Sequence, residues 1–368
     1  MLLKIIKKIF KILFISLSSV IALLLIMLLV IRINSTGNAE PILDKNGDII
    51  ENSISEIMDT LINGAPQRLT IRGTDISNPI LLKIHGGPAS AFIHPWAQDT
   101  ALEKRFVVCY WDQRGGGPAY TQKLPKSSFT LDQIVEDGIA VSKFLLERFG
   151  RNKIFIMGNS WGTAVGAFMV KQQPDLYSAY IGIGQMANQS LSEKLSYDFV
   201  WNKAMERKDT VAIEKLQGIG PPPYETTATM VKAVKIERYY VKKYAPIQAA
   251  NPDALGALTD FLLYDGLTFN YKLSFLSGDT KNNTFDLLWP ECTNINLIRD
   301  IPQWEIPVFI IQGAQDHFTE TSLAKTYYDA LQAPFKEWFL FENSTHMPDL
   351  EEPGKYREVL DEIIAKTK

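Results

Sequence analysis

Short apolar runs recur along most of the chain, and a polar or glycine-rich stretch follows each of them. Apolar runs of this length, bounded by turn residues, are typical of strands that are buried on both faces of a sheet. On this pattern, strands are predicted over residues 68–71, 79–84, 106–111, 153–157, 179–183, 307–311 and 337–341.

Segments with apolar residues at helical spacing lie between several of these runs. The clearest is 131–149, which Gly150 closes as a C-cap. Further helices are predicted over residues 161–171, 322–331 and 353–366. Strands that alternate with helices imply an α/β fold, with a mostly parallel central sheet and helices on both of its faces.

This alternation stops between residues 188 and 300. The region is helix-prone, rich in Tyr and Lys, and interrupted by three consecutive prolines at 221–223. We interpret 188–300 as a helical lid, inserted between the first half of the core (53–187) and the second half (301–368).

The N-terminal 33 residues contain an uncharged apolar stretch from 12 to 31, long enough to cross a bilayer as a helix. We interpret residues 1–33 as a transmembrane anchor and the polar segment 34–52 as a linker. Four lysines precede the apolar stretch and Arg32 follows it, which predicts a single-pass protein with a cytoplasmic N-terminus and its body outside the cell membrane. The alternative is a secreted protein whose signal peptide is cleaved near residues 37–39.

Charge and cysteine content narrow the possible partners. The net charge is −3, and because residues 1–32 are basic, the remaining body is acidic. An acidic body gives no electrostatic reason to expect nucleic-acid binding. Cys109 lies in an apolar run, as a buried free thiol would, and neither it nor Cys292 belongs to a metal-ligand spacing. No metal is expected.

Ser160 is the strongest candidate for chemistry. It lies in Gly158-Asn-Ser-Trp-Gly162, between the predicted strand 153–157 and the predicted helix 161–171. A G-x-S-x-G motif between a strand and a helix is typical of a nucleophile elbow, in which the flanking glycines permit a sharp turn. The turn would place the Ser160 hydroxyl at a helix N-terminus, where negative charge is favoured.

A nucleophilic serine requires a base and an orienting acid. After a nucleophile elbow, the chain order is Ser, then the acid (Asp or Glu), then the basic His. Only His317 and His346 follow Ser160 among the histidines. His346 comes after the predicted strand 337–341, and Asp316 comes after 307–311. We therefore predict Asp316 as the acid and His346 as the base, since His317 is adjacent to the acid in sequence and is poorly placed to reach it.

The tetrahedral intermediate of acyl transfer requires two N–H donors for its oxyanion. The backbone N–H of Trp161, directly after the serine, is one candidate. Gly87, in the His85-Gly-Gly-Pro88 loop after the strand 79–84, is the other. His85 is expected to hold this loop by hydrogen bonding rather than to transfer protons.

Taken together, these segments resemble the prolyl iminopeptidase branch of the α/β-hydrolases over residues 60–368. The motifs that carry the resemblance are HGGP at 85–88, DQRG at 112–115, GNSWG at 158–162, GAQD at 313–316 and the loop at His346. The resemblance implies a Ser160–Asp316–His346 triad, an oxyanion hole at Gly87 and Trp161, and no cofactor. It also implies removal of N-terminal residues, often proline, from peptides. The chain departs from the family's usual motifs at Ala89, at 116–119 and at Asn159.

An aminopeptidase needs carboxylates that bind the α-ammonium group of its substrate. The lid offers Glu193, Glu206, Glu225, Glu237, Asp253, Asp260 and Asp265, and possible walls for a proline ring at Tyr224, Tyr239, Tyr240, Phe261 and Phe269. The leading hypothesis is a membrane-tethered serine hydrolase, an aminopeptidase that cleaves small peptides or amino-acid amides by acyl transfer. A membrane-associated esterase or lipase-like hydrolase is the second, and a hydrolase-fold binding protein without turnover is the third.

Overall fold

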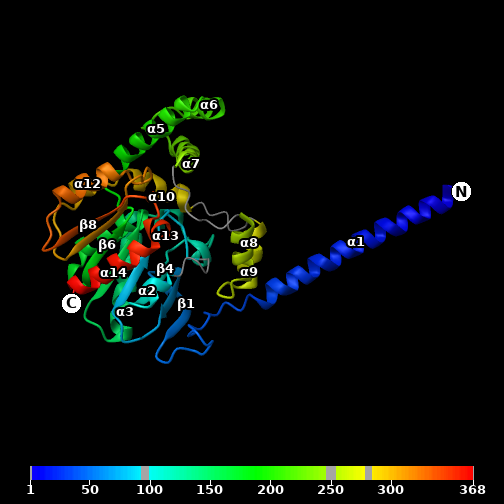
Figure 1. Ribbon diagram of the computed structural model, residues 1–368, viewed down its shortest axis with the longest axis horizontal. Helices are drawn as coiled ribbons and strands as arrows, with labels where there is room; N and C mark the ends of the chain where they lie inside the picture. The colour runs from blue at the N-terminus through cyan, green and yellow to red at the C-terminus, as the bar shows by residue number, and fades with distance from the viewer. Residues whose placement is uncertain (1, 93–98, 246–253, 278–283, 368) are drawn as a thin grey trace.

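An eight-stranded sheet with helices on both faces forms the body of the protein (Figure 1). The computed structural model describes residues 2–92, 99–245, 254–277 and 284–367. The strands lie in the order β1-β2-β4-β3-β5-β6-β7-β8, antiparallel between β1 and β2 and between β2 and β4, and parallel elsewhere. They are β1 (Ile54–Ile62), β2 (Ala65–Gly73), β3 (Ile80–Ile84), β4 (Val107–Asp112), β5 (Ile154–Asn159), β6 (Tyr177–Ile183), β7 (Val308–Gly313) and β8 (Lys336–Phe341). The predicted α/β fold with a mostly parallel sheet is confirmed.

Two apolar layers hold the helices to the sheet. One face packs against α3 (Leu131–Phe149), α4 (Trp161–Gln172) and α12 (Thr321–Ala330). The other packs against α2 (Thr100–Glu103) and α14 (Pro353–Thr367). Two short helices, α11 (Leu297–Asp300) and α13 (Pro348–Glu351), and three 3₁₀ turns, Gly117–Ala119, Lys126–Ser128 and Pro174–Leu176, complete the described core.

The ends of α3 show how local sequence sets an element. The Thr130 side chain accepts a hydrogen bond from the Gln133 N–H at the N-terminus, and Gly150 takes a left-handed conformation with φ 59° at the C-terminus. A side-chain cap and a C-terminal glycine are the two commonest ways to satisfy helix ends. The helix therefore occupies the predicted residues 131–149.

β1 is the strand that the apolar pattern did not predict. It lies at the edge of the sheet and pairs only with β2 among the described strands. Its residues are only partly buried, and Leu61 is exposed. An edge strand with one solvated face lacks the continuous apolar run that marked the central strands.

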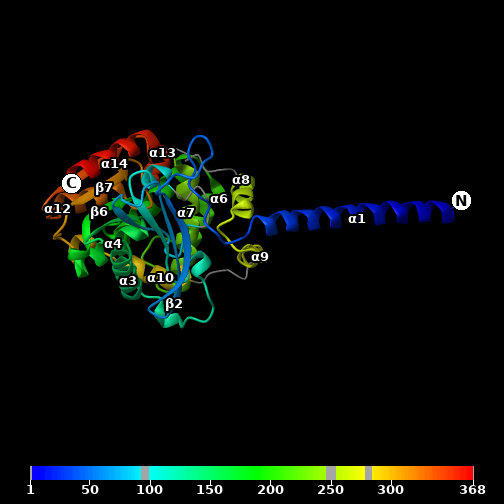
Figure 2. The same ribbon diagram turned by 90° about the horizontal axis from the view of Figure 1, so that it is seen from below.

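Within the described residues, six helices longer than α11 lie between β6 and β7, in the region interpreted as a lid. They are α5 (Gln189–Glu206), α6 (Thr210–Ile219), α7 (Thr227–Tyr244), α8 (Ala254–Leu263), α9 (Phe269–Ser277) and α10 (Thr284–Thr293). α5, α6 and α7 pack on one another around their own apolar cluster. They project from the body, whereas α8 and α9 lie on the side where the C-terminal end of the N-terminal helix meets the body (Figures 1 and 2).

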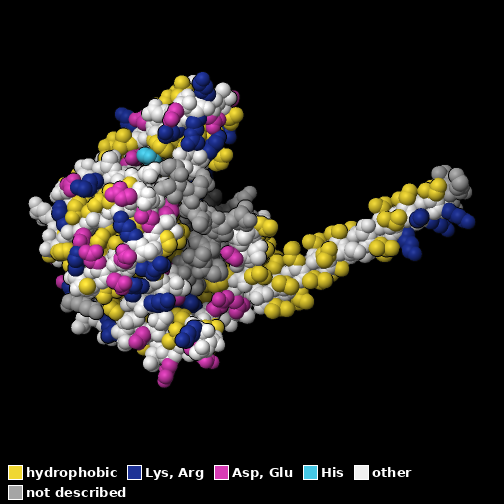
Figure 3. Space-filling model, viewed as in Figure 1, with side chains coloured by type: hydrophobic (Ala, Val, Ile, Leu, Met, Phe, Trp, Pro, Cys, Tyr) yellow, Lys and Arg dark blue, Asp and Glu magenta, His cyan; other side chains and the backbone are white. Residues whose placement is uncertain are grey.

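The N-terminal helix α1 (Leu2–Ile33) extends far from the body (Figures 1 and 2). Its side chains are exposed, and Figure 3 shows a continuous apolar surface with basic side chains at the outer end. Residues 4–33 have the length of a membrane-crossing helix and a mean hydropathy of 3.0. A signal sequence near an N-terminus has the same properties.

Candidate active site

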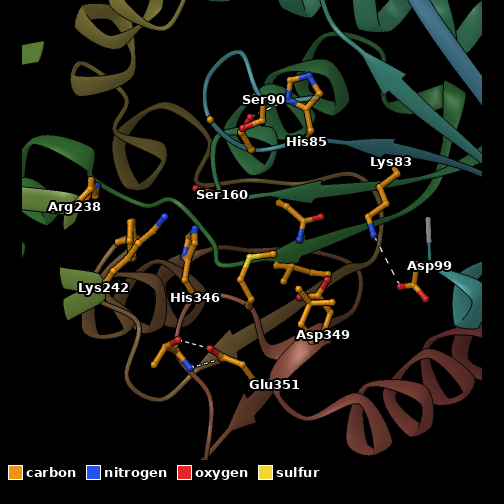
Figure 4. Close-up of a pocket in the computed structure, with 18 of the residues that line it drawn as sticks. Lys83, His85, Ser90, Asp99, Ser160, Arg238, Lys242, His346, Asp349 and Glu351 are labelled. Atoms are coloured by element: carbon orange, nitrogen blue, oxygen red, sulfur yellow. Dashed lines mark hydrogen bonds and ion pairs between the residues drawn. The ribbon is translucent and has the colours of Figure 1, made fainter. Parts of the chain in front are cut away.

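A cavity of about 1000 Å³ lies between the sheet and the lid helices α7 and α10. Ser160 and His346 line it at the carboxyl ends of the strands, and Arg238, Phe285 and Trp289 line it from the lid. Figure 4 shows the His346 ring pointing toward Ser160 across this space. A concave space that joins polar side chains from several strand ends is the usual form of an active site in this fold class.

Ser160 stands at the sharp turn between β5 and α4. Its backbone has φ 51° and ψ −118°, a strained conformation for a residue with a side chain, and its N–H donates to the Ile183 carbonyl at 2.9 Å. A Cβ on Gly158 would lie 2.3 Å from the Gly162 oxygen, and a Cβ on Gly162 would lie 2.3 Å from the Ile84 oxygen. Both flanking glycines are therefore sterically required, as the motif predicts.

His346 and Asp316 come together beside this turn. His346 Nδ1 lies 2.8 Å from Asp316 Oδ2, and the His346 ring stacks on Phe318 with ring centroids 4.9 Å apart. This contact fixes the orientation of the ring, and its other nitrogen is left for the cavity. Acyl transfer requires a hydroxyl, an imidazole and a carboxylate in series, and the contact between His346 and Asp316 supplies the last two of these groups.

Asp316 is buried and held as a carboxylate by its hydrogen bonds. Burial would raise the pKa of Asp316, but its pairing with His346 and the donors around it lower that pKa below its ordinary value. Besides His346, the donors are the N–H groups of Phe318 and Thr319, the Thr319 hydroxyl and the Gln312 amide. Gln312 and Thr319 had no motif that would identify them from sequence.

The glycine loop after β3 lies directly against Ser160. Gly86 makes the closest approach, because a Cβ there would lie 3.3 Å from Ser160 Cβ, and both Gly86 and Gly87 line the cavity. Gly87 has φ +120°, which favours glycine. Trp161 is the first residue of α4. Gly87 and Trp161, the two predicted oxyanion donors, thus directly follow the two residues that meet here, Gly86 and Ser160.

The DQRG motif has a structural role: its side chains and backbone hold the glycine loop in place by hydrogen bonds. Burial lowers the pKa of His85 to about 4, so the ring is neutral, donating from Nδ1 to the Gly86 carbonyl at 2.8 Å and accepting from the Gln113 N–H at 3.3 Å. Gln113 also accepts from the Trp161 indole at 3.3 Å. The structural role expected for His85 agrees with these bonds.

The two charged residues of the DQRG motif, Asp112 and Arg114, also make hydrogen bonds to other parts of the core. The Asp112 carboxylate accepts from the Phe92 N–H at 2.6 Å, and burial raises the pKa of Asp112 to about 7. Arg114 makes two hydrogen bonds to the buried Asp137 carboxylate, at 2.6 and 2.8 Å. A bidentate buried pair of this kind fixes the loop relative to α3.

The lid contributes a buried charge cluster behind the cavity wall. Arg238 on α7, which lines the cavity, pairs with Glu193 on α5 and, at 3.2 Å, with its neighbour Glu237. Burial and the nearby Glu193 charge raise the pKa of Glu237 to about 8. Among the described atoms, Glu237 Oε2 has no hydrogen-bond partner.

The structure distinguishes among the lid carboxylates, any of which the sequence offered as a binding group for the substrate's α-ammonium. Glu206, Glu225 and Asp260 are exposed. Asp265 is bonded to the segment after α1, and Asp253 lies outside the described residues. Glu193 and Glu237 are therefore the two that are buried beside the cavity.

The aromatic wall of the cavity also differs from the sequence candidates. Phe285, Trp289 and Phe318 line it. Tyr240 and Phe261, by contrast, are buried in separate apolar clusters of the lid. Aromatics at helical spacing do not indicate which face of a helix meets a cavity.

A second polar group lies at the opposite end of the cavity from the lid. Lys83 Nζ lies 3.9 Å from Asp99 Oδ2, and Asp349 is close to both, as Figure 4 shows. Asp349 is buried, which raises its pKa, and its Oδ1 has no partner among the described atoms. No sequence motif identified these three residues.

The remaining histidine after Ser160 and the two cysteines have no place in the proposed chemistry. His317 lines the cavity but lies against Glu320, with Nδ1 3.0 Å from Oε1, and stacks on Phe199. Cys109 and Cys292 are buried free thiols. Within the described residues, no three His, Cys, Asp or Glu side chains stand together as a metal site would need.

Comparisons with known proteins agree with this fold. The α/β hydrolase fold family matches residues 79–353. The Bacillus subtilis protein named "Probable aminopeptidase YbaC" is 30% identical over 314 residues, covering 84% of this chain and 96% of its own. The proline iminopeptidase of Clostridium botulinum is 27% identical, over 80% of this chain and 92% of its own.

Solved structures show the same fold. The crystal structure of the Mycobacterium smegmatis proline iminopeptidase superposes with a TM-score of 0.61 at 19% identity, covering 85% of this chain and 98% of that one. The proline iminopeptidase-related protein of Thermus thermophilus gives a TM-score of 0.55 at 17% identity, over 85% and 98% of the two chains. The chain thus belongs to the α/β-hydrolase family, in its prolyl iminopeptidase-like branch, and is a hydrolase.

Proposed function

We propose that the protein is a membrane-tethered serine aminopeptidase that acts on short peptides or amino-acid amides. The observation that carries the proposal is the 2.8 Å contact between Asp316 and a His346 ring that points toward Ser160. Relatives named aminopeptidase and proline iminopeptidase support the peptidase assignment.

The proposed mechanism uses only groups of this chain. His346 takes the proton of Ser160 as its oxygen attacks the substrate carbonyl, while Asp316 stabilises the imidazolium that forms. The backbone N–H groups of Trp161 and Gly87 bind the developing oxyanion. His346 then gives the proton to the leaving amine, and water releases the acyl group from Ser160 by the same steps.

The lid cluster supports recognition of a free amino terminus. With both carboxylates ionised, Glu193, Glu237 and Arg238 carry one net negative charge next to the cavity. An α-ammonium group bound at this wall balances that charge, and the Glu237 oxygen behind the wall has no other partner among the described atoms. Substrate binding would in this way ionise a carboxyl whose pKa is otherwise raised.

An esterase is the second candidate, because Phe285, Trp289 and Val234 give the lid side of the cavity an apolar wall. A short ester binds to such a wall without an ammonium group. The peptidase assignment is preferred because two buried carboxylates beside an apolar wall are costly unless they are used.

A fluorophosphonate probe tests the nucleophile. Wild-type protein and Ser322→Ala, an exposed serine on α12, should both be labelled, and Ser160→Ala should not. Labelling of Ser160→Ala at the wild-type rate would overturn the proposal, and no labelling of the wild type would favour a binding protein without turnover.

Substrate pairs then separate the two enzyme classes. Proline naphthylamide should be cleaved and its N-acetylated form should not, because acetylation removes the ammonium charge. Turnover of short p-nitrophenyl esters with no cleavage of any amino-acid amide would select the esterase.

The proposed location is the cell membrane, with α1 as the anchor and the body outside. The basic residues at the outer end of α1 support this orientation. Protease added to intact cells should digest the body, and digestion only after lysis would reverse the orientation.

A further inference from the structure

The hairpin of helices α8 and α9 lies beside the C-terminal end of α1, on the side of the body from which α1 projects (Figures 1 and 2). It belongs to the lid by its place in the sequence. It contributes no residue to the described lining of the cavity. Its position therefore needs another explanation.

Asp265, in the turn between the two helices, binds the segment that follows α1. Its carboxylate accepts from the Thr36 N–H at 2.9 Å and from the Thr36 hydroxyl at 2.8 Å. Its carbonyl accepts from the Gly37 N–H at 2.9 Å. Three hydrogen bonds from one turn hold this segment against the hairpin.

Lys272 on α9 makes a second, buried attachment. Its ammonium donates to the Asn34 carbonyl at 2.5 Å and to the Leu262 carbonyl at 2.8 Å. Nearby, the Arg32 guanidinium lies 5.3 Å from the centre of the Phe269 ring, and Ile31 is buried. The last turn of α1 is thus packed on the hairpin.

The hairpin is also fixed to the sheet. Arg68 on β2 donates to the Gly266 carbonyl at 2.9 Å and binds the Asp59 carboxylate of β1 through two further hydrogen bonds. The hairpin therefore connects α1 with the body.

The outer surface of the hairpin is apolar despite these polar attachments. Its exposed large apolar side chains are Leu255, Leu258, Leu263, Leu273, Phe275 and Leu276. Figure 3 shows apolar surface in this region continuing onto the base of α1. Soluble surfaces rarely gather so many large apolar side chains in one place unless a partner covers them.

We propose that the α8–α9 hairpin is a second membrane contact, seated in the interfacial layer of the bilayer beside the end of α1. The inference rests on the proposed anchoring by α1. The uncharged stretch 12–31 spans roughly 30 Å as a helix, about the thickness of the hydrocarbon layer. Arg32 and the hairpin packed on it then lie at the headgroup level, where amphipathic helices bury their apolar faces.

The same contacts bear on whether the N-terminal segment is removed. Cleavage near residues 37–39 would take away Asn34 and Thr36, and with them partners of Lys272 and Asp265. Retention of α1 keeps the hairpin's polar groups paired. The proposal therefore includes an uncleaved anchor.

The test measures lipid contact at single positions of the full-length protein. Leu255 on the hairpin is the test position, and Leu61 on β1 is its matched control, because their side chains are 72% and 71% exposed. Each is replaced by Cys and labelled with an environment-sensitive dye, while Cys109 and Cys292 are buried. Leu23→Cys, within α1, reports insertion of the anchor. The proteins are reconstituted into phosphatidylethanolamine–phosphatidylglycerol vesicles. These carry a lipid spin-labelled near its headgroup, which reports on Leu255→Cys and Leu61→Cys, and a lipid spin-labelled near the end of its acyl chain, which reports on Leu23→Cys.

The dye at Leu255→Cys should lose about half or more of its fluorescence, because an interfacial helix lies roughly 5–10 Å into the boundary layer. The dye at Leu61→Cys should be unaffected. Quenching at Leu23→Cys with none at Leu255→Cys would overturn the hairpin contact alone. No quenching at either position would overturn the anchor, and with it this inference, and would leave the hydrolase proposal untouched.

Discussion

Two buried groups of charged residues lie behind the wall of the same cavity, which their partners His346 and Arg238 line, and they differ in how completely their hydrogen bonds are satisfied. Asp316, in the core, accepts five hydrogen bonds and holds His346 in one orientation. Glu237, in the lid, has a free oxygen among the described atoms and a raised pKa. The core group is complete without a substrate, whereas the lid group has a position that a ligand can complete.

The difference follows from what each group has to do. Residues for acyl transfer must be preorganised, since reorganisation during the reaction would add to the barrier. A group that selects a substrate gains by being unsatisfied, because the correct ligand then supplies an interaction that a wrong one lacks.

The largest expected effect comes from removing the charge of the complete group. Asp316→Asn should lower kcat by about 10⁴-fold, because the amide cannot hold His346 in the tautomer that accepts the serine proton. Steady-state kinetics on an amino-acid naphthylamide measure the loss. Asp329→Asn, on the surface of α12, is the control and should retain activity. A loss below about tenfold would contradict the role of Asp316.

A backbone change at the elbow should have the next largest effect. Gly162→Ala places a Cβ 2.3 Å from the Ile84 oxygen and 2.8 Å from the His85 oxygen. We expect destabilisation of roughly 3 kcal/mol, measured by urea unfolding, since the contacts are backbone atoms that cannot rotate away. Gly218→Ala on α6 is the control, because nothing lies within 4 Å of its Cβ position. Equal stability of the two variants would contradict the steric account.

The unsatisfied lid group should affect binding rather than turnover. Glu237→Gln should raise KM for amino-acid amides roughly 10- to 100-fold, the usual range for a hydrogen bond to a charged group. Hydrolysis of short esters should be unchanged. Glu206→Gln, at an exposed position of α5, provides the control. If both substrate classes lost activity alike, Glu237 would have a structural role instead.

The same residue should make stability depend on pH. Burial raises the pKa of Glu237 from an ordinary 4.5 to about 8, so the folded state keeps a proton that the unfolded state has already released. Its contribution is present below pH 4.5 and is lost as pH rises toward about 8. Thermal unfolding midpoints should fall less over this interval in Glu237→Gln than in the wild type. Parallel curves would contradict the raised pKa.

The smallest expected effect lies in the glycine loop. Ala89 has φ 64°, a left-handed conformation that costs a residue with a Cβ about 1–2 kcal/mol. Ala89→Gly removes that cost but loosens the unfolded chain, so the net gain in unfolding free energy should be below about 1 kcal/mol. A clear loss of stability would show that the Ala89 methyl group makes a compensating contact.

The sequence predicted the core of this protein far better than its lid. Ser160, Asp316 and His346 each follow a short apolar strand, and parallel strands bring their carboxyl ends to one edge. That rule requires no knowledge of side-chain packing. The edge strand β1 escaped prediction because one of its faces meets solvent.

The lid could not be interpreted in the same way. Which of its carboxylates is buried depends on how α5 packs against α7, and the composition of the helices does not determine that packing. Glu193 and Glu206 lie on the same helix and look alike in sequence, yet only Glu193 meets Arg238. Gln113, which connects His85 to Trp161, had a motif but no assigned role.

The attachment of Asn34 and Thr36 to the hairpin also determines where a soluble enzyme should be cut for crystallisation. A fragment that begins at residue 31 keeps the partners of Lys272 and Asp265 and discards nearly all of the apolar helix. One that begins at residue 41 is only slightly shorter but leaves a buried ammonium group without the Asn34 carbonyl. The longer fragment should therefore give the better-behaved sample.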